Sequence, residues 1–489
     1  MVRCRKPLTI APCLYRISAV VLLLTPLAAS AGSPSLLGAF TTGIDASDVV
    51  LLSGSSNVCV AGSRFQKNFQ VIGVTNPVAP AFVSRLVEND VSGDRVTLSD
   101  DHSRAYMVGF FGGMKIVALD NPGAPAQLGT YGDGGARIRD VAVTSDRRFA
   151  FVADESDGIQ VVILTNEALP VLVGQYQNVF SNRHNAAGLA LSDDDMTLYV
   201  AAEDGGLVIL SVTNPPSPTQ VGHFTRPPGS GGFTGVHLSS DGRIAYAVGG
   251  EGNSDEAFRV ISVTNPAAPT LLSGYADPQR GESFADVAMS PDGTTAFLVG
   301  RNVGLQVVDV SRETSVFYVS EFHELIDDVA PQATGVALSE DGNTAYIAQH
   351  GSGMRVVDVS GVYDVDDDGL PNWWEVLHFN SVTSASPTDD GDGDNFSNRE
   401  EFIAGTNPDD VQSLFRIEDL AVSAGANVSL DSVSGRRYDL LTASALASNT
   451  VWVPVVGATN RSGNDAAIQL SDTNASPRAF YRVNVRMAD

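Results

Sequence analysis

The sequence predicts an all-β fold built from seven copies of one short repeat. Each copy begins with Gly or Asp followed by alternating apolar residues, and the copies recur about every 48 residues, at Asp48, Asp94, Asp140, Gly188, Gly235, Asp286 and Gly335. This spacing is typical of the four-stranded blades of a propeller. Because a repeat of this size cannot bury its own apolar face, neighbouring copies must pack on one another. The sequence therefore predicts a seven-bladed β-propeller over residues 32–361.

The sixth copy illustrates the strands expected in each repeat. Val287–Ser290 is predicted to form the innermost strand. Ser290–Gly293 is a predicted turn, because Asp-Gly favours tight hairpins that match the twist of the flanking strands. Thr295–Val299 and Leu305–Val310 are the expected second and third strands.

In other copies the third strand ends at Thr-Asn-Pro, as at Thr75–Pro77, and a fourth strand follows, as at Thr270–Tyr275. Proline has no N–H for a strand ladder, so it favours a turn there. The third copy departs from this pattern with Asn166-Glu167, and the sixth departs with Ser311–Thr314. The turn is therefore less strongly predicted in those two blades.

The seventh copy contains only three strands, ending at Met354–Val359. Ser33–Phe40, at the other end of the propeller, resembles the fourth-strand pattern Pro-x-x-Leu-x-Gly-x-Tyr, with one residue fewer between Pro34 and the final aromatic residue, which is Phe. We expect this N-terminal strand to complete the seventh blade and close the ring. Closure protects strand edges that an open array would leave unpaired.

The third strands of the repeat resemble those of the LVIVD-repeat propellers, which are bacterial and archaeal secreted or surface proteins. Examples are Leu305–Ser311 and Gly206–Ser211, and Asn-Pro-x-x-Pro follows the third strand in the repeat. The resemblance covers about Ser33–Gly361. It implies the propeller fold strongly and a function only weakly, since propellers host many functions.

The N-terminal segment has the features of a signal peptide over residues 1–31. Four basic residues precede the short apolar stretch Ile17–Ala29, which contains Pro26, and Ala29–Ala31 is a small-x-small cleavage site. An uncleaved membrane anchor is the alternative. No later segment approaches the roughly 20 apolar residues that a spanning helix needs. The sequence thus predicts a protein without a membrane span after cleavage, secreted or placed in the bacterial periplasm or on the cell surface.

Charge and cysteine content narrow the function classes. The formal net charge of −27 argues against nucleic-acid binding, which depends on Lys and Arg neutralising phosphates. Cys4 and Cys13 lie in the predicted signal peptide, so Cys59 alone remains and no intramolecular disulfide is expected. An exported chain without disulfides must be stabilised by its core or by metal.

The clearest chemical motif follows the propeller, within residues 362–410. Carboxylates stand at positions one, three, five and twelve of a loop with Gly at position six: Asp364, Asp366, Asp368 and Glu375. This fits D-x-D-x-D-G-x₅-E, the calcium loop of an EF-hand. Calcium takes six to eight hard oxygens, and the backbone carbonyl of position seven, Leu370, is the remaining expected protein ligand.

A second loop repeats the pattern with Asp390, Asp392, Asp394 and Glu401, and Phe396 occupies position seven. Asn395 stands where Gly is expected, and Asn tolerates the left-handed backbone that this position needs. Short helices are expected near Pro371–Phe379 and Asn398–Ala404, with Gly405 ending the second. An acidic disordered linker is the alternative to paired calcium sites.

Neither loop is preceded by a helix, so each is half of an EF-hand. The segment that includes Ala404–Pro408 resembles thrombospondin type 3 repeats of bacterial secreted proteins, which implies calcium (Ca²⁺) as the bound ion. A dockerin, with a cohesin partner, is the alternative resemblance; each loop ending in Glu and the short linking helix argue against it.

Residues 411–489 are predicted to form a small C-terminal β-sandwich, weakly similar to C-terminal β modules of bacterial secreted proteins. Six short strands support this prediction: Phe415–Ile417, Asn427–Leu430, Arg437–Leu441, Val451–Val456, Ala467–Leu470 and Phe480–Val485.

The leading functional hypothesis is a noncatalytic binding or adhesion protein, whose propeller face binds an unidentified protein or glycan. The longest connections between blades, residues 177–187, 225–234 and 322–334, are the expected walls of that surface. A metal-dependent, lactonase-like hydrolase is one alternative, and a structural envelope component is another. The Asp residues at repeat starts either ring the central channel and attract a cation or serve the turn chemistry of the repeat.

Overall fold

We analysed a computed structural model of the chain. The structure describes residues 33–487 apart from short gaps at 42–44, 55, 63–67, 88–92, 110–111, 133–136, 156, 178–184, 227–231, 251–256, 277–282, 325–331, 423–424, 447–449 and 475–478. The predicted signal peptide lies outside the described residues, as do large parts of the three long connections between blades.

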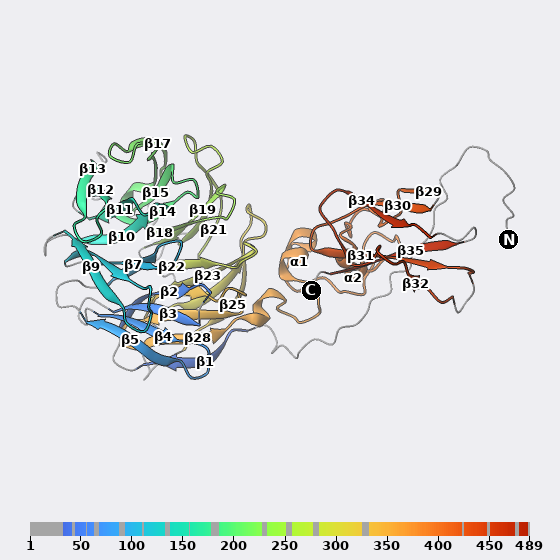
Figure 1. The fold of residues 1–489 in the computed structure, drawn as a ribbon, viewed down its shortest axis with the longest axis horizontal. Helices are drawn as coiled ribbons and strands as arrows, with labels where there is room; N and C mark the ends of the chain where they lie inside the picture. The colour runs from blue at the N-terminus through green and yellow to red at the C-terminus, as the bar shows by residue number, and fades with distance from the viewer. Residues whose placement is uncertain are drawn as a thin grey trace.

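Seven four-stranded antiparallel sheets form the described part of the N-terminal domain (Figure 1). Blades one to three comprise β2 (Ala46–Leu52), β3 (Asn57–Gly62), β4 (Asn68–Gly73) and β5 (Ala81–Val87); β6 (Arg95–Leu98), β7 (Arg104–Gly109), β8 (Gly113–Ala118) and β9 (Ala126–Tyr131); and β10 (Ile138–Val143), β11 (Phe149–Asp154), β12 (Gly158–Ile163) and β13 (Val171–Tyr176).

Blades four to six follow the same order of strands. They comprise β14 (Ala186–Leu191), β15 (Thr197–Ala202), β16 (Gly206–Ser211) and β17 (Thr219–Phe224), with the short helix η1 (Glu203–Gly205); β18 (Phe233–Leu238), β19 (Ile244–Gly249), β20 (Phe258–Ser262) and β21 (Thr270–Tyr275); and β22 (Asp286–Met289), β23 (Thr295–Gly300), β24 (Gly304–Asp309) and β25 (Phe317–Phe322).

The seventh blade joins the two ends of the propeller, as the sequence predicts. It contains β26 (Ala333–Leu338), β27 (Thr344–Gln349) and β28 (Gly353–Asp358), and its fourth strand is β1 (Ser35–Phe40). β1 runs antiparallel to β28, from Ser35 opposite Asp358 to Phe40 opposite Met354. Phe40 is buried in an apolar cluster that blades one and seven share. The ring is therefore closed by hydrogen bonds and by packing.

Apolar side chains from neighbouring blades form common cores. One such cluster combines Phe151 and Val161 of blade three with Leu198 and Val208 of blade four. Alternating residues of the second and third strands face opposite neighbours, so each blade contributes to the core on both of its sides. This packing explains why a single repeat of the sequence cannot fold alone.

The turn after the third strand survives in the two blades whose sequence departs from Asn-Pro. The N–H of Leu169 in blade three donates to the carbonyl of Asn166 at 2.9 Å, and the N–H of Ser315 in blade six donates to that of Arg312 at 2.8 Å. The N–H of Ala268 makes the same bond to Asn265 in blade five. In blade three, Glu167 takes the place of proline and accepts from Nε of Arg104 in blade two at 2.9 Å. The departure therefore adds an ion pair between blades without altering the turn.

A short connector leads from the propeller to the C-terminal module (Figure 1). It contains the 3₁₀ helix η2 (Ser360–Tyr363) and the helices α1 (Asn372–Phe379) and α2 (Asn398–Ala404). No helix in the described residues is long and apolar enough to span a membrane.

Two small sheets form the C-terminal module. One contains β29 (Asp419–Val422), β30 (Ala426–Asp431) and β34 (Ala467–Asp472); the other contains β31 (Arg436–Ala443), β32 (Val453–Pro454), β33 (Arg461–Ser462) and β35 (Phe480–Met487). Side chains such as Val428, Leu440 and Leu470 pack in one core between them. The strand predicted at Phe415–Ile417 is wrong: this segment has no strand pairing, and its apolar side chains pack on the core instead.

Candidate metal centre

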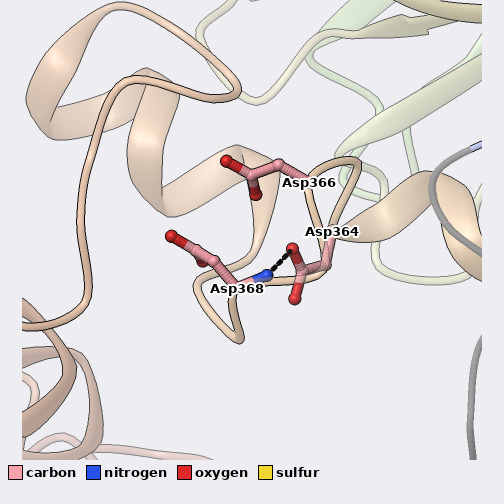
Figure 2. A group of neighbouring side chains, drawn as sticks. All are labelled: Asp364, Asp366 and Asp368. Atoms are coloured by element: carbon pink, nitrogen blue, oxygen red, sulfur yellow. Dashed lines mark hydrogen bonds between the residues drawn. The ribbon is translucent and has the colours of Figure 1, made fainter.

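The first predicted loop begins directly after η2 and ends in α1. One carboxylate oxygen each from Asp364, Asp366 and Asp368 lies within 4.8 Å of the other two. Figure 2 shows the three side chains on one tight turn. Alternate residues of the turn therefore converge, as the spacing of the motif predicts.

Backbone hydrogen bonds hold this loop in shape. Asp364 accepts from the N–H of Asp368 at 3.2 Å and from that of Gly369 at 2.8 Å. Asp368 accepts from the N–H of Leu370 at 2.8 Å. Gly369 has a φ of +87°, a conformation that suits glycine, so the Gly at position six has the role that the motif assigns to it.

The second loop has the same geometry at the same positions. Asp390, Asp392 and Asp394 again bring one oxygen each within 4.8 Å of the others. Asp390 accepts from the N–H groups of Asp394 and Asn395, and Asp394 accepts from that of Phe396 at 2.7 Å. Asn395 has a φ of +74°, so the left-handed conformation predicted for this substituted position is confirmed.

The position-twelve glutamates lie buried beside these clusters. Glu375 and Glu401 are 0% and 1% exposed, and the Oε2 atom of each has no hydrogen-bond partner among the described residues. The buried Oδ2 atoms of Asp392 and Asp394 likewise have no hydrogen-bond partner among the described residues. Buried carboxylate oxygens are costly without a partner, because they lose water and gain nothing in return. The donor set thus fits a bound cation.

Electrostatics supports the same conclusion. Burial, helped by the carboxylates of Asp366, Asp368 and Asp364 and opposed by one backbone hydrogen bond from Ala385, raises the pKa of Glu375 to about 8. Burial and the aspartates of the second loop raise the pKa of Glu401 to about 7. Like charges at close range resist ionisation, and a divalent cation removes that resistance.

The structure also brings in two asparagines that the sequence analysis missed. Asn372 and Asn398 occupy position nine of their loops, and both are buried. The Asn372 amide accepts from the N–H of Val365 at 2.9 Å and donates to the carbonyl of Val362 at 2.6 Å. Asn398 donates to the carbonyl of Ser386 at 2.8 Å. The recurrence of asparagine at position nine of both loops was the feature of the sequence that could have identified them.

The two loops form one unit. Leu370 and Trp374 from the first half pack with Phe402 from the second in a common apolar cluster. Nη1 of Arg399, at position ten of the second loop, donates to the carbonyl of Asp368 in the first at 3.4 Å. α2 begins with a capping box, in which Ser397 and Glu400 exchange hydrogen bonds with the backbone. The carbonyls of Leu370 and Phe396 remain predicted ligands.

The central channel contains a mixed cluster rather than a ring of carboxylates. In blade one, Asp48 pairs with Ala61 of the second strand. Val108 occupies the position of Ala61 in blade two, and its partner is Arg95. Arg95, not Asp94, is therefore equivalent to Asp48 and Asp140. Arg95 lies 3.8 Å from Asp48 and 3.4 Å from Asp286, and it donates to the carbonyl of Ala285 at 3.0 Å. It therefore links blade two with blades one and six.

The channel aspartates also join neighbouring blades. Asp48 accepts the N–H of Val96 at 2.9 Å, and Asp140 accepts that of Leu189 at 2.8 Å. Burial raises the pKa of Asp48 to about 7, although Arg95 opposes the shift. These contacts favour the structural interpretation of the repeat-start aspartates over a channel cation site.

Comparisons with known proteins support the fold. The LVIVD repeat model matches residues 135–178, 187–226 and 332–361. Among solved structures, the β-propeller domain of Myceliophteria_thermophila Cps50 (Swd1) is similar, with a TM-score of 0.51 and 12% identity over 67% of this chain and 99% of that domain. No curated protein matches the chain. The chain thus contains LVIVD repeats within a β-propeller.

Proposed function

We propose that this protein is an exported, noncatalytic binding or adhesion protein whose connector binds two calcium ions, one in each loop. The observation that carries the proposal is the repetition of one arrangement. Both loops converge three aspartates, and both bury a position-twelve glutamate with an unpartnered oxygen. An acidic linker without a ligand would gain nothing from burying these carboxylates twice.

Calcium is the cation that suits these donors best. Every proposed ligand is a hard oxygen, which favours calcium, magnesium or manganese over zinc or copper. Magnesium demands near-ideal octahedral geometry and keeps several waters. A twelve-residue loop closed by a glutamate that can offer two oxygens fits the larger, more flexible shell of calcium. The resemblance to thrombospondin type 3 repeats points to the same ion.

The propeller is the proposed interaction platform for a protein or glycan. The channel supports a noncatalytic role, because the guanidinium of Arg95 lies among the carboxylates that a catalytic cation would need. The proposed export agrees with the calcium assignment, because extracellular modules bind calcium with dissociation constants of about 10⁻⁴ to 10⁻³ M.

Isothermal titration calorimetry tests the calcium assignment. The full chain should bind two calcium ions, with affinities near the extracellular range. Asp366→Asn and Asp392→Asn should each weaken one site. Asp367→Asn is the matched control, because this exposed residue at position four removes one charge from the same loop without removing a ligand. Absence of a binding heat at millimolar calcium would overturn the assignment. Pull-down from cell-surface extract, with and without calcium, tests the platform role.

A further inference from the structure

We propose that bound calcium fixes the orientation of the C-terminal module relative to the propeller, through one arginine at each end of the connector. This inference rests on the calcium binding proposed above and adds a mechanical role for it. The propeller supplies Arg312 and the C-terminal module supplies Arg436. Each guanidinium binds the C-terminal end of one of the two short helices that follow the calcium loops.

On the propeller side, Arg312 holds the end of α1. Its Nη2 donates to the carbonyl of Leu377 at 2.6 Å, and its Nη1 donates to Oδ1 of Asn380 at 3.0 Å. A cation at this end of a helix binds the unpaired carbonyls and is favoured by the helix dipole. Arg312 stands in blade six where blade five has Asn265 of its Asn-Pro turn. The departure of the sixth copy from the repeat pattern therefore coincides with a contact to the connector.

The start of the first loop is also anchored to the propeller. The hydroxyl of Tyr363 donates to the carbonyl of Gly342 in blade seven at 2.7 Å. The ring of Tyr363 meets that of Phe297 in blade six edge-on, with 6.3 Å between centroids. Val362 is buried in the core shared by those two blades. Asp364 thus follows directly after a segment that is fixed to the propeller.

On the other side, Arg436 holds the end of α2. Its Nη2 donates to the carbonyl of Phe402 at 2.7 Å, and its guanidinium lies 5.7 Å from the centroid of the Phe402 ring. Ile403 and Ala404 pack against the core of the C-terminal module. α2 is therefore docked on that module as α1 is docked on the propeller.

The cluster around Trp374 joins the two helices. The centroid of the Trp374 ring lies 5.9 Å from that of the Phe402 ring, so α1 and α2 meet directly. The contacts run without interruption from Arg312 through α1 and α2 to Arg436.

Calcium should strengthen this chain of contacts, because both short helices depend on packing and on the loops from which they begin. They contain 8 and 7 residues, well below the length at which isolated helices are stable. Each begins within a loop whose clustered carboxylates repel one another without a cation. Removal of the ions should therefore weaken the attachment of both helices to their loops, and the arginine contacts should break more often.

Small-angle X-ray scattering of the full chain tests the inference, with calorimetry on the same samples. In calcium, one conformation should fit the profile. Chelation should increase the radius of gyration and broaden the distance distribution. Arg312→Ala should bind two calcium ions with affinities within about threefold of wild type, yet give at least half of the increase caused by chelation. Arg312→Lys should restore part of the compact profile. Arg243→Ala, an exposed arginine on blade five, is the matched control and should scatter as wild type.

The outcomes separate the two proposals. Two bound ions with a profile that chelation leaves unchanged would overturn the orienting role and leave the calcium assignment standing. An unchanged profile for Arg312→Ala in calcium would also overturn the role of this arginine contact. Absence of any calcium binding would overturn the proposed function, and the inference with it.

Discussion

Replacement of Glu375 by Gln should make the connector more stable without calcium and less stable with it. The two effects have separate causes. Without calcium, burial and three neighbouring aspartates raise the pKa of Glu375 from its ordinary value of 4.5 to about 8. Near pH 7 the connector must therefore take up a proton at Glu375 when it folds. A glutamine has no such requirement.

The magnitude follows from the pH interval. A pKa that is higher in the folded state contributes stability at low pH that is lost as the pH rises, here between 4.5 and about 8. Near pH 7 the ceiling is about 3 kcal/mol at 1.36 kcal/mol per unit, and solvent screening around the loop reduces it to about 2 kcal/mol. Glu375→Gln should gain about this amount in chelator, and the gain should vanish near pH 4.

With calcium the sign reverses. Glu375 can offer the ion two charged oxygens, whereas Gln offers one neutral oxygen. The loss should be about 3 kcal/mol, which is roughly a hundredfold in affinity at the first loop. The second loop should retain its affinity, because its own glutamate, Glu401, is unchanged.

Thermal melting followed by tryptophan fluorescence measures both effects. All three tryptophans, Trp373, Trp374 and Trp452, lie outside the propeller. A Trp452→Phe background leaves two reporters, both in α1. Asp367→Asn is the control for loss of one charge from the loop. If Glu375→Gln lowers the melting temperature in chelator and leaves calcium stabilisation intact, Glu375 is an ordinary structural residue and the reasoning fails.

Three further predictions concern the ring and the loop scaffold. Phe40→Ala should destabilise the propeller by about 3–5 kcal/mol in denaturant unfolding, because Phe40 is buried where the ring closes; an unchanged midpoint would argue against closure by β1. Arg95→Met should destabilise the propeller by about 3 kcal/mol, because Asp48 and Asp286 lose their cation. The pKa of Asp48 is raised to about 7, so Asp48 needs a cation at pH 8, where it is ionised, more than at pH 5. The loss should therefore be larger at pH 8 than at pH 5, and a pH-independent loss would contradict this prediction. Asn372→Ala should weaken calcium binding at the first loop about tenfold in calorimetry while the second loop keeps its affinity, and equal weakening of both loops would refute a local scaffold role.

The repeat pattern allowed the propeller to be predicted because blade geometry depends on local alternation and turn chemistry. The closing strand was predictable for the same reason, since Ser35–Phe40 carries the fourth-strand pattern far from its partner. The alignment of the second repeat failed by one residue. Asp94 matches the residue type, but strand pairing puts Arg95 at the equivalent position. Residue type alone does not determine register.

The loops were predictable because their ligands are spaced along a single segment. The supporting contacts were not, because they join distant parts of the chain. Arg312 and Arg436 look like ordinary exposed arginines in the sequence, and only the fold brings them to the ends of α1 and α2. Asn372 and Asn398 look like common polar residues at the start of a helix, although both are buried.

A crystal structure of the full chain in saturating calcium tests the central claim most directly. The account predicts one ion in each loop, bound in the first by Asp364, Asp366, Asp368 and both oxygens of Glu375, and in the second by the equivalent residues. Anomalous scattering would identify the ions as calcium. Loops that hold no ion at millimolar calcium, with the position-twelve glutamates still buried and unpartnered, would contradict it.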